Sequence, residues 1–234
     1  MRVSISQPAY LPWLGYFDKI VQSDVHVVLD NVALERSSTT RFTNRNRVKS
    51  NSGPIWLTVP VVTSGFGQPL IKDVLIDNEQ RWQNKHRRTI EQSYSKASHF
   101  AELQPFIELS YGQKWNELDH LLDGQRAWLL KKLGIKTDIM VNSEINTVGN
   151  KSDLILDICK TLGAATYLSG PFGRDYLELD RFAEEDISVE FHNYSHPTYR
   201  QIGSSGFEPF LSVLDLLANC GESSLDVLTS SPTC

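Results

Sequence analysis

The pattern of apolar positions predicts an alternation of strands and helices along most of the chain. Residues 3–6 and 24–29 are short apolar runs, and the second is unbroken, as in a strand that is covered on both faces. Between them, Leu14, Phe17, Ile20 and Val21 recur at helical spacing, which predicts a strand–helix–strand unit. We expect further strands at 55–62, 70–76, 137–141, 165–168 and 187–192, and helices at 79–95, 99–110, 114–132, 151–162, 175–184 and 210–218.

This alternation is typical of an α/β protein with a largely parallel sheet. We therefore predict a mostly parallel, Rossmann-like, three-layer α/β sandwich. No repeat or low-complexity linker interrupts the sequence, so we expect a single domain over residues 1–228 and a short tail at 229–234. In an open sheet of this kind, ligands bind at the carboxyl ends of the strands, so polar residues that follow strands are candidates for a site.

The composition is that of an ordinary globular protein, with 234 residues, 40% hydrophobic and 22% charged, and a net charge of −5. This acidic balance argues against general binding to nucleic acid or to an anionic membrane. No apolar run is long enough to span a bilayer, and no signal peptide precedes the first strand, so we expect a cytoplasmic protein. Basic residues nevertheless gather in two groups, which favours a specific anionic ligand. The first group is Arg36, Arg41, Arg45, Arg47 and Lys49, and the second is Arg81, Lys85, Arg87 and Arg88.

The three cysteines predict no metal site and no disulfide framework. Cys159, Cys220 and Cys234 are widely spaced and form no CxxC motif. Cys159 lies in an apolar helical segment, which is typical of a buried packing residue, whereas a nucleophile needs a cationic, partly exposed setting. Neither GxGxxG nor GxxxxGK[ST] occurs, so no motif indicates a particular cofactor.

A rigid aromatic segment follows the first strand. Two prolines and two aromatic residues occur within six positions, which is costly for a helix and unnecessary for a plain turn. We interpret Gln7, Tyr10 and Trp13 as the wall of a pocket that stacks on a ring or a sugar. Asp30, at the end of the second strand, is expected to face the same pocket, where it either orients a substrate hydroxyl or amine or caps the next segment.

Two further segments are candidates for binding phosphate. Asn44, Arg45 and Arg47 belong to the densest polar cluster, which is either a solvated loop after the second strand or a site for a nucleotide diphosphate. Ser169 and Gly170 begin a glycine-bearing loop between a strand and a helix, where backbone N–H groups can approach a phosphate.

Two histidines and Asp30 are the candidates for catalysis. His86 lies on the apolar stripe of the helix at 79–95, so it points inward and is either a core histidine or a general base. His196 lies in a turn just after the last predicted strand, a position that often carries catalytic groups. The two histidines can meet only if the helix of His86 covers the ends of the first two strands.

Taken together, these segments resemble the WbqC-like family of bacterial proteins, which is commonly associated with O-antigen and other surface-polysaccharide gene clusters. The resemblance extends over nearly the whole chain. It is carried by 7–19, 23–30, 44–49, 56–61, Trp82 with Lys85 and His86, Lys151 and Ser152, 168–170, His196 and Pro197 with Gln201, and 212–221. The sequence departs from the family pattern at Ser6, where the family has a His or another larger residue, and over 37–42, where an aromatic residue usually precedes the Asn-Arg run.

The resemblance implies an enzyme that transfers an acyl or aminoacyl group to a sugar-linked amine. Its substrate would be a nucleotide-linked amino sugar, its donor a carrier-protein or coenzyme A thioester, and its base one of the two histidines. The first strand–helix–strand unit is also similar to the nucleotidyltransferase-like fold of pantothenate synthetase, without the His-x-Gly-His signature of that family. An ATP-dependent amide ligase or nucleotidyltransferase that holds Mg²⁺ on a carboxylate such as Asp30 is therefore an alternative. A non-catalytic nucleotide-sugar-binding protein is another.

Overall fold

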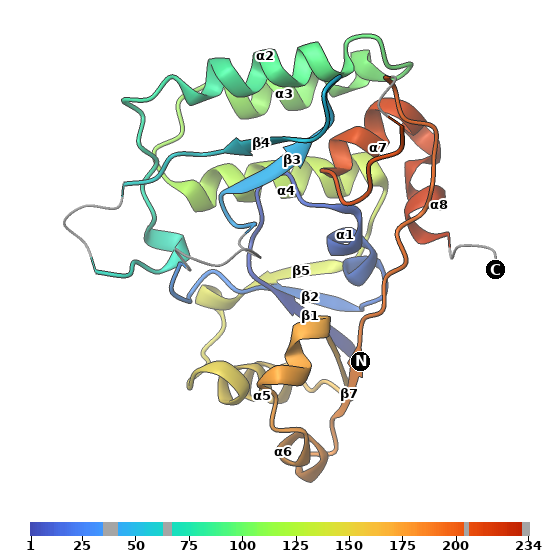
Figure 1. Cartoon of the computed structure of the whole chain (residues 1–234). Helices are drawn as coiled ribbons and strands as arrows, with labels where there is room; N and C mark the ends of the chain where they lie inside the picture. Colours follow the sequence, from blue (N-terminus) through green and yellow to red (C-terminus); the bar gives the residue numbers. More distant parts are fainter. Residues whose placement is uncertain (35–41, 63–66, 204–205, 231–234) are drawn as a thin grey trace. The chain divides into compact units, whose positions relative to one another are not determined.

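The computed structural model describes residues 1–34, 42–62, 67–203 and 206–230 (Figure 1). The chain groups into two compact units. Unit 1 comprises Met1–Pro8, Asp18–Val32 and Lys136–Tyr194, and unit 2 comprises Ala9–Phe17, Ala33–Ile135 and Ser195–Cys234. The single domain predicted over residues 1–228 stays a prediction. The chain passes between the two units several times without a linker of distinct composition.

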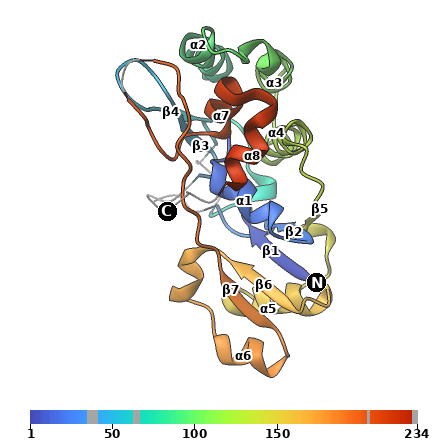
Figure 2. The same cartoon turned by 90° about the vertical axis from the view of Figure 1, so that its right-hand side faces the viewer.

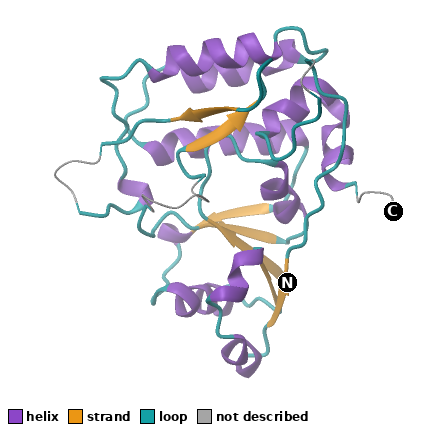
Figure 3. Ribbon diagram, in the orientation of Figure 1, coloured by secondary structure: helices purple, strands orange, loops and turns teal. Residues whose placement is uncertain are grey.

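Unit 1 is built around a five-stranded parallel sheet. Its strands are β1 (Arg2–Ser6), β2 (Val25–Val28), β5 (Asp138–Val141), β6 (Thr166–Ser169) and β7 (Ser188–Phe191), in the order β5-β2-β1-β6-β7. Figure 3 draws the strands of the protein in orange and its helices in purple. Val3 pairs with Val25 and Ser6 with Val28, which confirms the predicted pairing of 3–6 with 24–29. The mostly parallel, three-layer α/β fold is likewise confirmed.

Helices cover both faces of this sheet. α1 (Leu14–Val21) connects β1 to β2, α5 (Lys151–Thr161) connects β5 to β6, and α6 (Leu179–Glu184) connects β6 to β7. The first connection runs toward one edge of the sheet and the other two toward the opposite edge. Right-handed crossovers therefore place α1 on one face and α5 and α6 on the other, as Figures 1 and 2 show. Two 3₁₀ turns, Asn142–Glu144 and Pro171–Asp175, follow β5 and β6.

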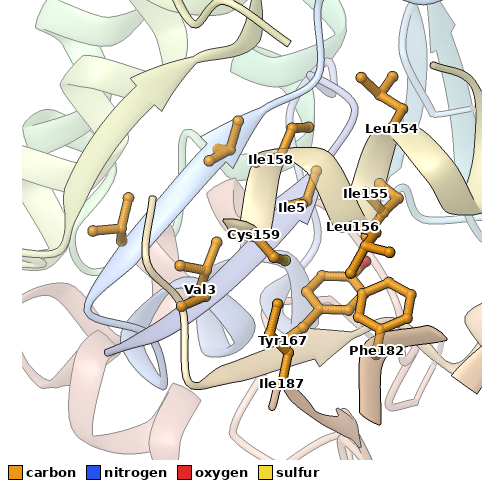
Figure 4. Close-up of a cluster of buried hydrophobic side chains, with 13 residues drawn as sticks. Val3, Ile5, Leu154, Ile155, Leu156, Ile158, Cys159, Tyr167, Phe182 and Ile187 are labelled. Carbon is orange, nitrogen blue, oxygen red and sulfur yellow. The ribbon is translucent and has the colours of Figure 1, made fainter. Parts of the chain in front are cut away.

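A hydrophobic core fills the space between α5 and the sheet. Figure 4 shows apolar side chains of α5, among them Ile155, Ile158 and Cys159, beside Ile5 of β1 and Tyr167 of β6. Burial raises the pKa of the Cys159 thiol to about 12, so the thiol stays protonated at neutral pH. Cys159 is therefore a packing residue, as its apolar setting in the sequence indicates.

Unit 2 combines a hairpin with helices. β3 (Arg45–Val48) and β4 (Ile55–Thr58) form the antiparallel hairpin. The helices are α2 (Trp82–Tyr94), α3 (Gln104–Tyr111), α4 (Leu118–Leu133), α7 (Val213–Cys220) and α8 (Ser224–Thr229), with 3₁₀ turns at Ile71–Asp73, Phe100–Leu103 and Gly221–Ser223. All of these helices except α8 were predicted, and Gly134 ends α4 in the left-handed conformation, at φ +72°. Within the described residues, no helix is long and apolar enough to cross a membrane.

One predicted strand of unit 2 is corrected by the structure. Residues 70–76 form no continuous strand. They contain the 3₁₀ turn Ile71–Asp73, and the residues on either side of this turn form isolated β-bridges with Ala33, Val61 and Glu117. The buried residues of this segment are Ile71, Val74 and Ile76. Their spacing is three and then two, whereas a strand requires a spacing of two throughout. The apparent alternation in the sequence therefore covers only the second half of the segment.

Candidate functional site

The polar cluster at 44–47 lies on the hairpin and not in a solvated loop. Along β3, Asn46 is buried whereas Arg45 and Arg47 are half-buried, so the amides point inward and the guanidinium groups outward. The Nδ2 atoms of Asn44 and Asn46 donate to backbone carbonyl oxygens of neighbouring segments at 2.8 and 2.6 Å. Asn44 is buried, and a contact between it and a substrate stays a prediction.

The two arginines of β3 lie over an exposed indole. Their guanidinium carbons are 4.7 Å (Arg45) and 5.6 Å (Arg47) from the ring centre of Trp56, which is 43% exposed. This cation–π contact holds both guanidinium groups close to the indole. The hairpin therefore presents two guanidinium groups of the kind that bind phosphate or carboxylate.

Phe210 brings two more of the predicted residues to this hairpin. Its ring packs edge-on against the ring of Trp13, with centroids 5.7 Å apart, and against the imidazole of His196, at 5.1 Å. Its backbone carbonyl accepts a hydrogen bond from Arg47 at 3.4 Å. Phe207 also packs edge-on against His196, at 5.8 Å.

The backbone around Phe210 explains this position. Ser212 donates to the carbonyl of Arg47 at 2.9 Å, and Val213 donates to the carbonyl of Pro12 at 2.8 Å. The segment is thus held between β3 and the residues that precede α1. The φ of Phe210 is +59°, a left-handed conformation that costs an aromatic residue about 1–2 kcal/mol. This conformation leaves the ring 47% exposed, and strain of this kind clusters at functional sites.

We term this set of side chains in unit 2 the aromatic–arginine surface. It consists of Trp13, Arg45, Arg47, Trp56, His196, Phe207 and Phe210. Four of these, Trp13, Arg45, Arg47 and His196, are candidates from the sequence. The other three were not singled out, because the sequence does not reveal which large aromatic residues stay exposed.

His196 has the tautomer that a general base needs. Its Nδ1 lies 2.9 Å from the carbonyl oxygen of Pro197, which can only accept, so Nδ1 carries the proton and Nε2 the lone pair. Burial lowers the pKa of His196, so the ring is neutral at pH 7. A neutral imidazole of this tautomer accepts a proton at Nε2, an atom that is buried here, so proton transfer requires a substrate group that reaches it.

His86 and Tyr10 lie together in the interior of unit 2. Tyr10 OH is 2.8 Å from His86 Nδ1 and 2.6 Å from Tyr111 OH, and His86 is 2% exposed. Burial lowers the pKa of His86 to about 3, so its ring is neutral at pH 7. The inward position of His86 is confirmed. Tyr10 is fully buried, and its role as a pocket wall stays a prediction.

The first basic group of the sequence is divided in the structure. Arg36 and Arg41 lie outside the described residues. Lys49 is buried, and its Nζ donates to Gln201 Oε1 at 2.8 Å. It also interacts with the carboxylate of Asp215, whose pKa burial raises to about 6. Lys49 therefore belongs to an internal polar network and not to the aromatic–arginine surface.

The second basic group lies on α2. Arg81, Lys85 and Arg88 are exposed and line a shallow groove of about 400 Å³. Arg87 points elsewhere, since it forms ion pairs with Glu91 at 3.1 Å and with Glu108 at 3.2 Å. Only three of the four cations therefore contribute to this patch.

The remaining candidates follow strands of unit 1. Gln7 follows β1 and is exposed, while Ser169 is buried and donates to the carbonyl of Gly170 at 3.0 Å. Asp30 is buried, and its Oδ1 accepts from the backbone N–H of Ser143 at 2.9 Å, in the turn after β5. Asp30 thus caps a turn, although not the segment next to it in the sequence, and a role in orienting a substrate stays a prediction.

Asp18 and His192 form a pair in unit 1 that sequence reasoning missed. His192 directly follows β7, and its Nε2 lies 2.6 Å from Asp18 Oδ2 of α1, with both side chains less than one tenth exposed. The available signal was a histidine at the carboxyl end of a strand. Its partner could not be found, because it lies 174 positions away.

Comparison with known proteins supports the resemblance that the motifs indicated. Residues 7–227 match the model of the WbqC-like protein family. Over 229 residues, which are 97% of either chain, the sequence is 33% identical to "Uncharacterized protein Rv1507c" from Mycobacterium tuberculosis (strain ATCC 25618 / H37Rv). No solved structure matches the chain significantly. Since the match extends over almost the whole sequence, the chain belongs to the WbqC-like protein family.

Proposed function

We propose that this chain transfers an acyl or aminoacyl group to the amine of a nucleotide-linked amino sugar bound at the aromatic–arginine surface. The observation that carries the proposal is the packing of Phe210 against both Trp13 and His196, beside the guanidinium of Arg47. This arrangement combines groups that stack, bind anions and accept protons. The association of the WbqC-like family with surface-polysaccharide gene clusters supports a sugar as the acceptor.

The surface offers a separate contact for each part of such a substrate. Arg45 and Arg47 can donate in-plane N–H groups to the diphosphate, and hydrogen bonds to charged groups are the strong ones in proteins. The exposed rings of Trp56 and Phe210 offer apolar area against which a base or a sugar can pack. In a nucleotide sugar bound in this way, the arginines would hold the diphosphate and the aromatic rings would hold the base or the sugar. The amine of the sugar would stay free to react.

The reaction needs a base but no protein nucleophile. The neutral amine attacks the carbonyl carbon of a carrier-protein or coenzyme A thioester, so that a C–N bond forms and the C–S bond breaks. The amine loses one proton to Nε2 of His196, and the imidazolium then gives that proton to the departing thiolate. His196 is suited to the first step because its ring is neutral and its Nδ1 proton is held by Pro197.

Mass spectrometry of nucleotide amino sugars incubated with the chain and candidate thioesters tests this proposal. The expected result is the mass of one acyl group added to the sugar, with one free thiol released for each product. Pyrophosphate release that requires ATP, Mg²⁺ and the free acid would favour an amide ligase instead. Binding of the nucleotide sugar with no turnover on any donor would favour a binding protein.

A further inference from the structure

The strand order of unit 1 defines a switch point between β1 and β6. The chain runs from β1 to β2 and β5 toward one edge, and then returns to β6 and β7 on the other side of β1. In open α/β sheets, ligands bind outside the carboxyl ends of the two central strands whose connections run in opposite directions. Strand pairing marks the place: the β1–β6 ladder ends at Ser4 and Leu168, whereas the β1–β2 ladder continues to Ser6.

The ammonium group of Lys19 lies at this switch point. Its Nζ donates to the backbone carbonyl of Ile5 at 2.9 Å. The next carbonyl, that of Ser6, accepts from Leu29 N on the β2 side. Successive carbonyls of a strand point to opposite neighbours, so the Ile5 carbonyl points toward β6, one residue beyond the end of the ladder. Lys19 therefore occupies the hydrogen-bonding position that β6 leaves open.

The charge of Lys19 has no counter-ion among the described residues. Lys19 is 8% exposed. Among the described residues, the carbonyl of Ile5 is the one hydrogen-bond partner of the Lys19 ammonium group. Burial lowers the pKa of Lys19 to about 8, so most molecules still carry the charge at pH 7. An ammonium has three donors, and a neutral carbonyl takes one of them. A buried cation without an anion is costly, so this arrangement calls for an anionic partner.

A second buried polar pair lies at the carboxyl ends of the strands of the same sheet. Asp18, the residue before Lys19 on α1, hydrogen-bonds to His192 at the end of β7. The end of β6, with Ser169 and Gly170, lies between β1 and β7 in the sheet order. The hydrophobic core that α5 forms with the sheet contains neither of these polar pairs. The carboxyl ends of the adjacent strands β1, β6 and β7 thus lie beside polar or ionisable side chains, namely Lys19, Ser169 and His192. The packing of α5 on the sheet does not require these side chains.

We propose that the β1–β6 switch point binds an oxyanion, the phosphate or carboxylate group of a small molecule, whose charge is neutralised by Lys19. The site uses no residue of the aromatic–arginine surface, and it stands whether or not the chain is an acyltransferase. Phosphate and carboxylate share the required chemistry, a compact anion with several acceptor oxygens.

Thermal unfolding of the full chain tests this site with two probes, sulfate in place of a phosphate group and acetate in place of a carboxylate. At constant ionic strength, a specific anion raises Tm because it binds only the folded state. A response to sulfate alone identifies a phosphate-bearing ligand, and a response to acetate alone a carboxylate-bearing one. If neither anion shifts Tm, the proposal is overturned.

Variants separate specific binding from the general stabilising effect of sulfate. Lys19→Gln keeps a donor for the Ile5 carbonyl but removes the charge, so the anion should bind about tenfold more weakly or not at all. Lys160→Gln is the matched control, since Lys160 is an exposed lysine of the same unit that pairs with Glu185. It should respond like the wild type.

Equal responses in Lys19→Gln, Lys160→Gln and the wild type would overturn the site. If Lys19→Gln fails to fold, ¹⁵N NMR of the wild-type lysine side chains decides instead. The Nζ resonance of Lys19 should then shift on addition of the anion that raises Tm. A resonance that stays in place at saturating anion would also overturn the proposal.

Discussion

The ring of Phe210 packs edge-on against the imidazole of His196, with the two ring centroids 5.1 Å apart. Because the carbonyl of Phe210 also accepts a hydrogen bond from Arg47, this one residue connects the histidine to the arginine hairpin. Substrate binding by this surface can be tested at Arg45 and Arg47, and proton transfer can be tested separately at His196.

Replacement of Arg45 or Arg47 by Ala should weaken the binding of a nucleotide sugar by ~1.5–3 kcal/mol, the scale of hydrogen bonds to charged groups. Isothermal titration calorimetry measures this change. Arg87→Ala is a suitable control, because Arg87 already pairs with Glu91 and Glu108, and its affinity should stay at the wild-type value. Wild-type affinity in both β3 variants, with folding intact, would assign the two arginines to the solvated surface.

His196→Gln should lower kcat by roughly 10²–10⁴-fold and leave substrate affinity nearly unchanged, as expected when a general base is lost. Steady-state kinetics with a thioester donor checks the first part and calorimetry the second. His120→Gln provides a matched control, since its exposed imidazole is paired with Glu117. Turnover at the wild-type rate by His196→Gln would remove this histidine from the mechanism.

Gly15→Ala should displace the indole of Trp13. A Cβ atom at position 15 would lie 2.3 Å from the Trp13 ring, which is closer than atoms can approach. The indole would have to leave Phe210, so nucleotide-sugar binding should weaken by about 1 kcal/mol, the scale of an aromatic contact. Calorimetry and tryptophan emission report the change. Gly67→Ala, where an added Cβ meets no atom of the described residues within 4 Å, should alter neither, and an unchanged Gly15→Ala would contradict the prediction.

His86 should make the folded state sensitive to acid. Its pKa is about 3 when folded and near 6.5 when unfolded, so between these values only the unfolded chain takes up the proton. The free energy of unfolding should therefore fall as the pH falls from 6.5, by up to about 1.4 kcal/mol per pH unit from this group.

Urea unfolding of the wild type and His86→Gln between pH 4 and 7 measures this contribution as the difference between their slopes. Asp215 acts in the opposite direction, because its pKa is raised to about 6 in the folded state, but it is present in both proteins and cancels. His86→Gln should show the weaker acid dependence, while its kcat should stay near the wild-type value. Parallel pH curves for the two proteins would refute the assignment.

The sequence predicted the central strands because both of their faces are buried. β2, for example, is buried at every position, so its apolar run is unbroken. β3 escaped prediction because its buried positions include Asn46, whose amide is satisfied by a backbone carbonyl far along the chain. A rule that equates burial with apolar side chains cannot find such a strand.

The candidate site was predictable in its parts but not in its assembly. Residue type and position singled out Trp13, Arg47 and His196. Their connection through Phe210 depends on backbone hydrogen bonds from residues 212–213 and on the left-handed φ of Phe210. Neither feature can be predicted from the composition or the spacing of the sequence. The Asp18–His192 pair could not be predicted for a related reason, since its two residues are 174 positions apart in the sequence.

The pairing of β2 with β5 has a consequence for synthesis on the ribosome. Val25 pairs with Asp138, and the residues from Ala33 to Ile135 between them belong to unit 2. During translation, β2 can pair with β1 soon after both have emerged, but its other edge has no partner until more than a hundred further residues have been made. An unpaired edge strand is a template for association with other chains. Nascent or truncated chains that end within unit 2 should thus be the forms most prone to aggregate, and the ones that depend most on chaperones.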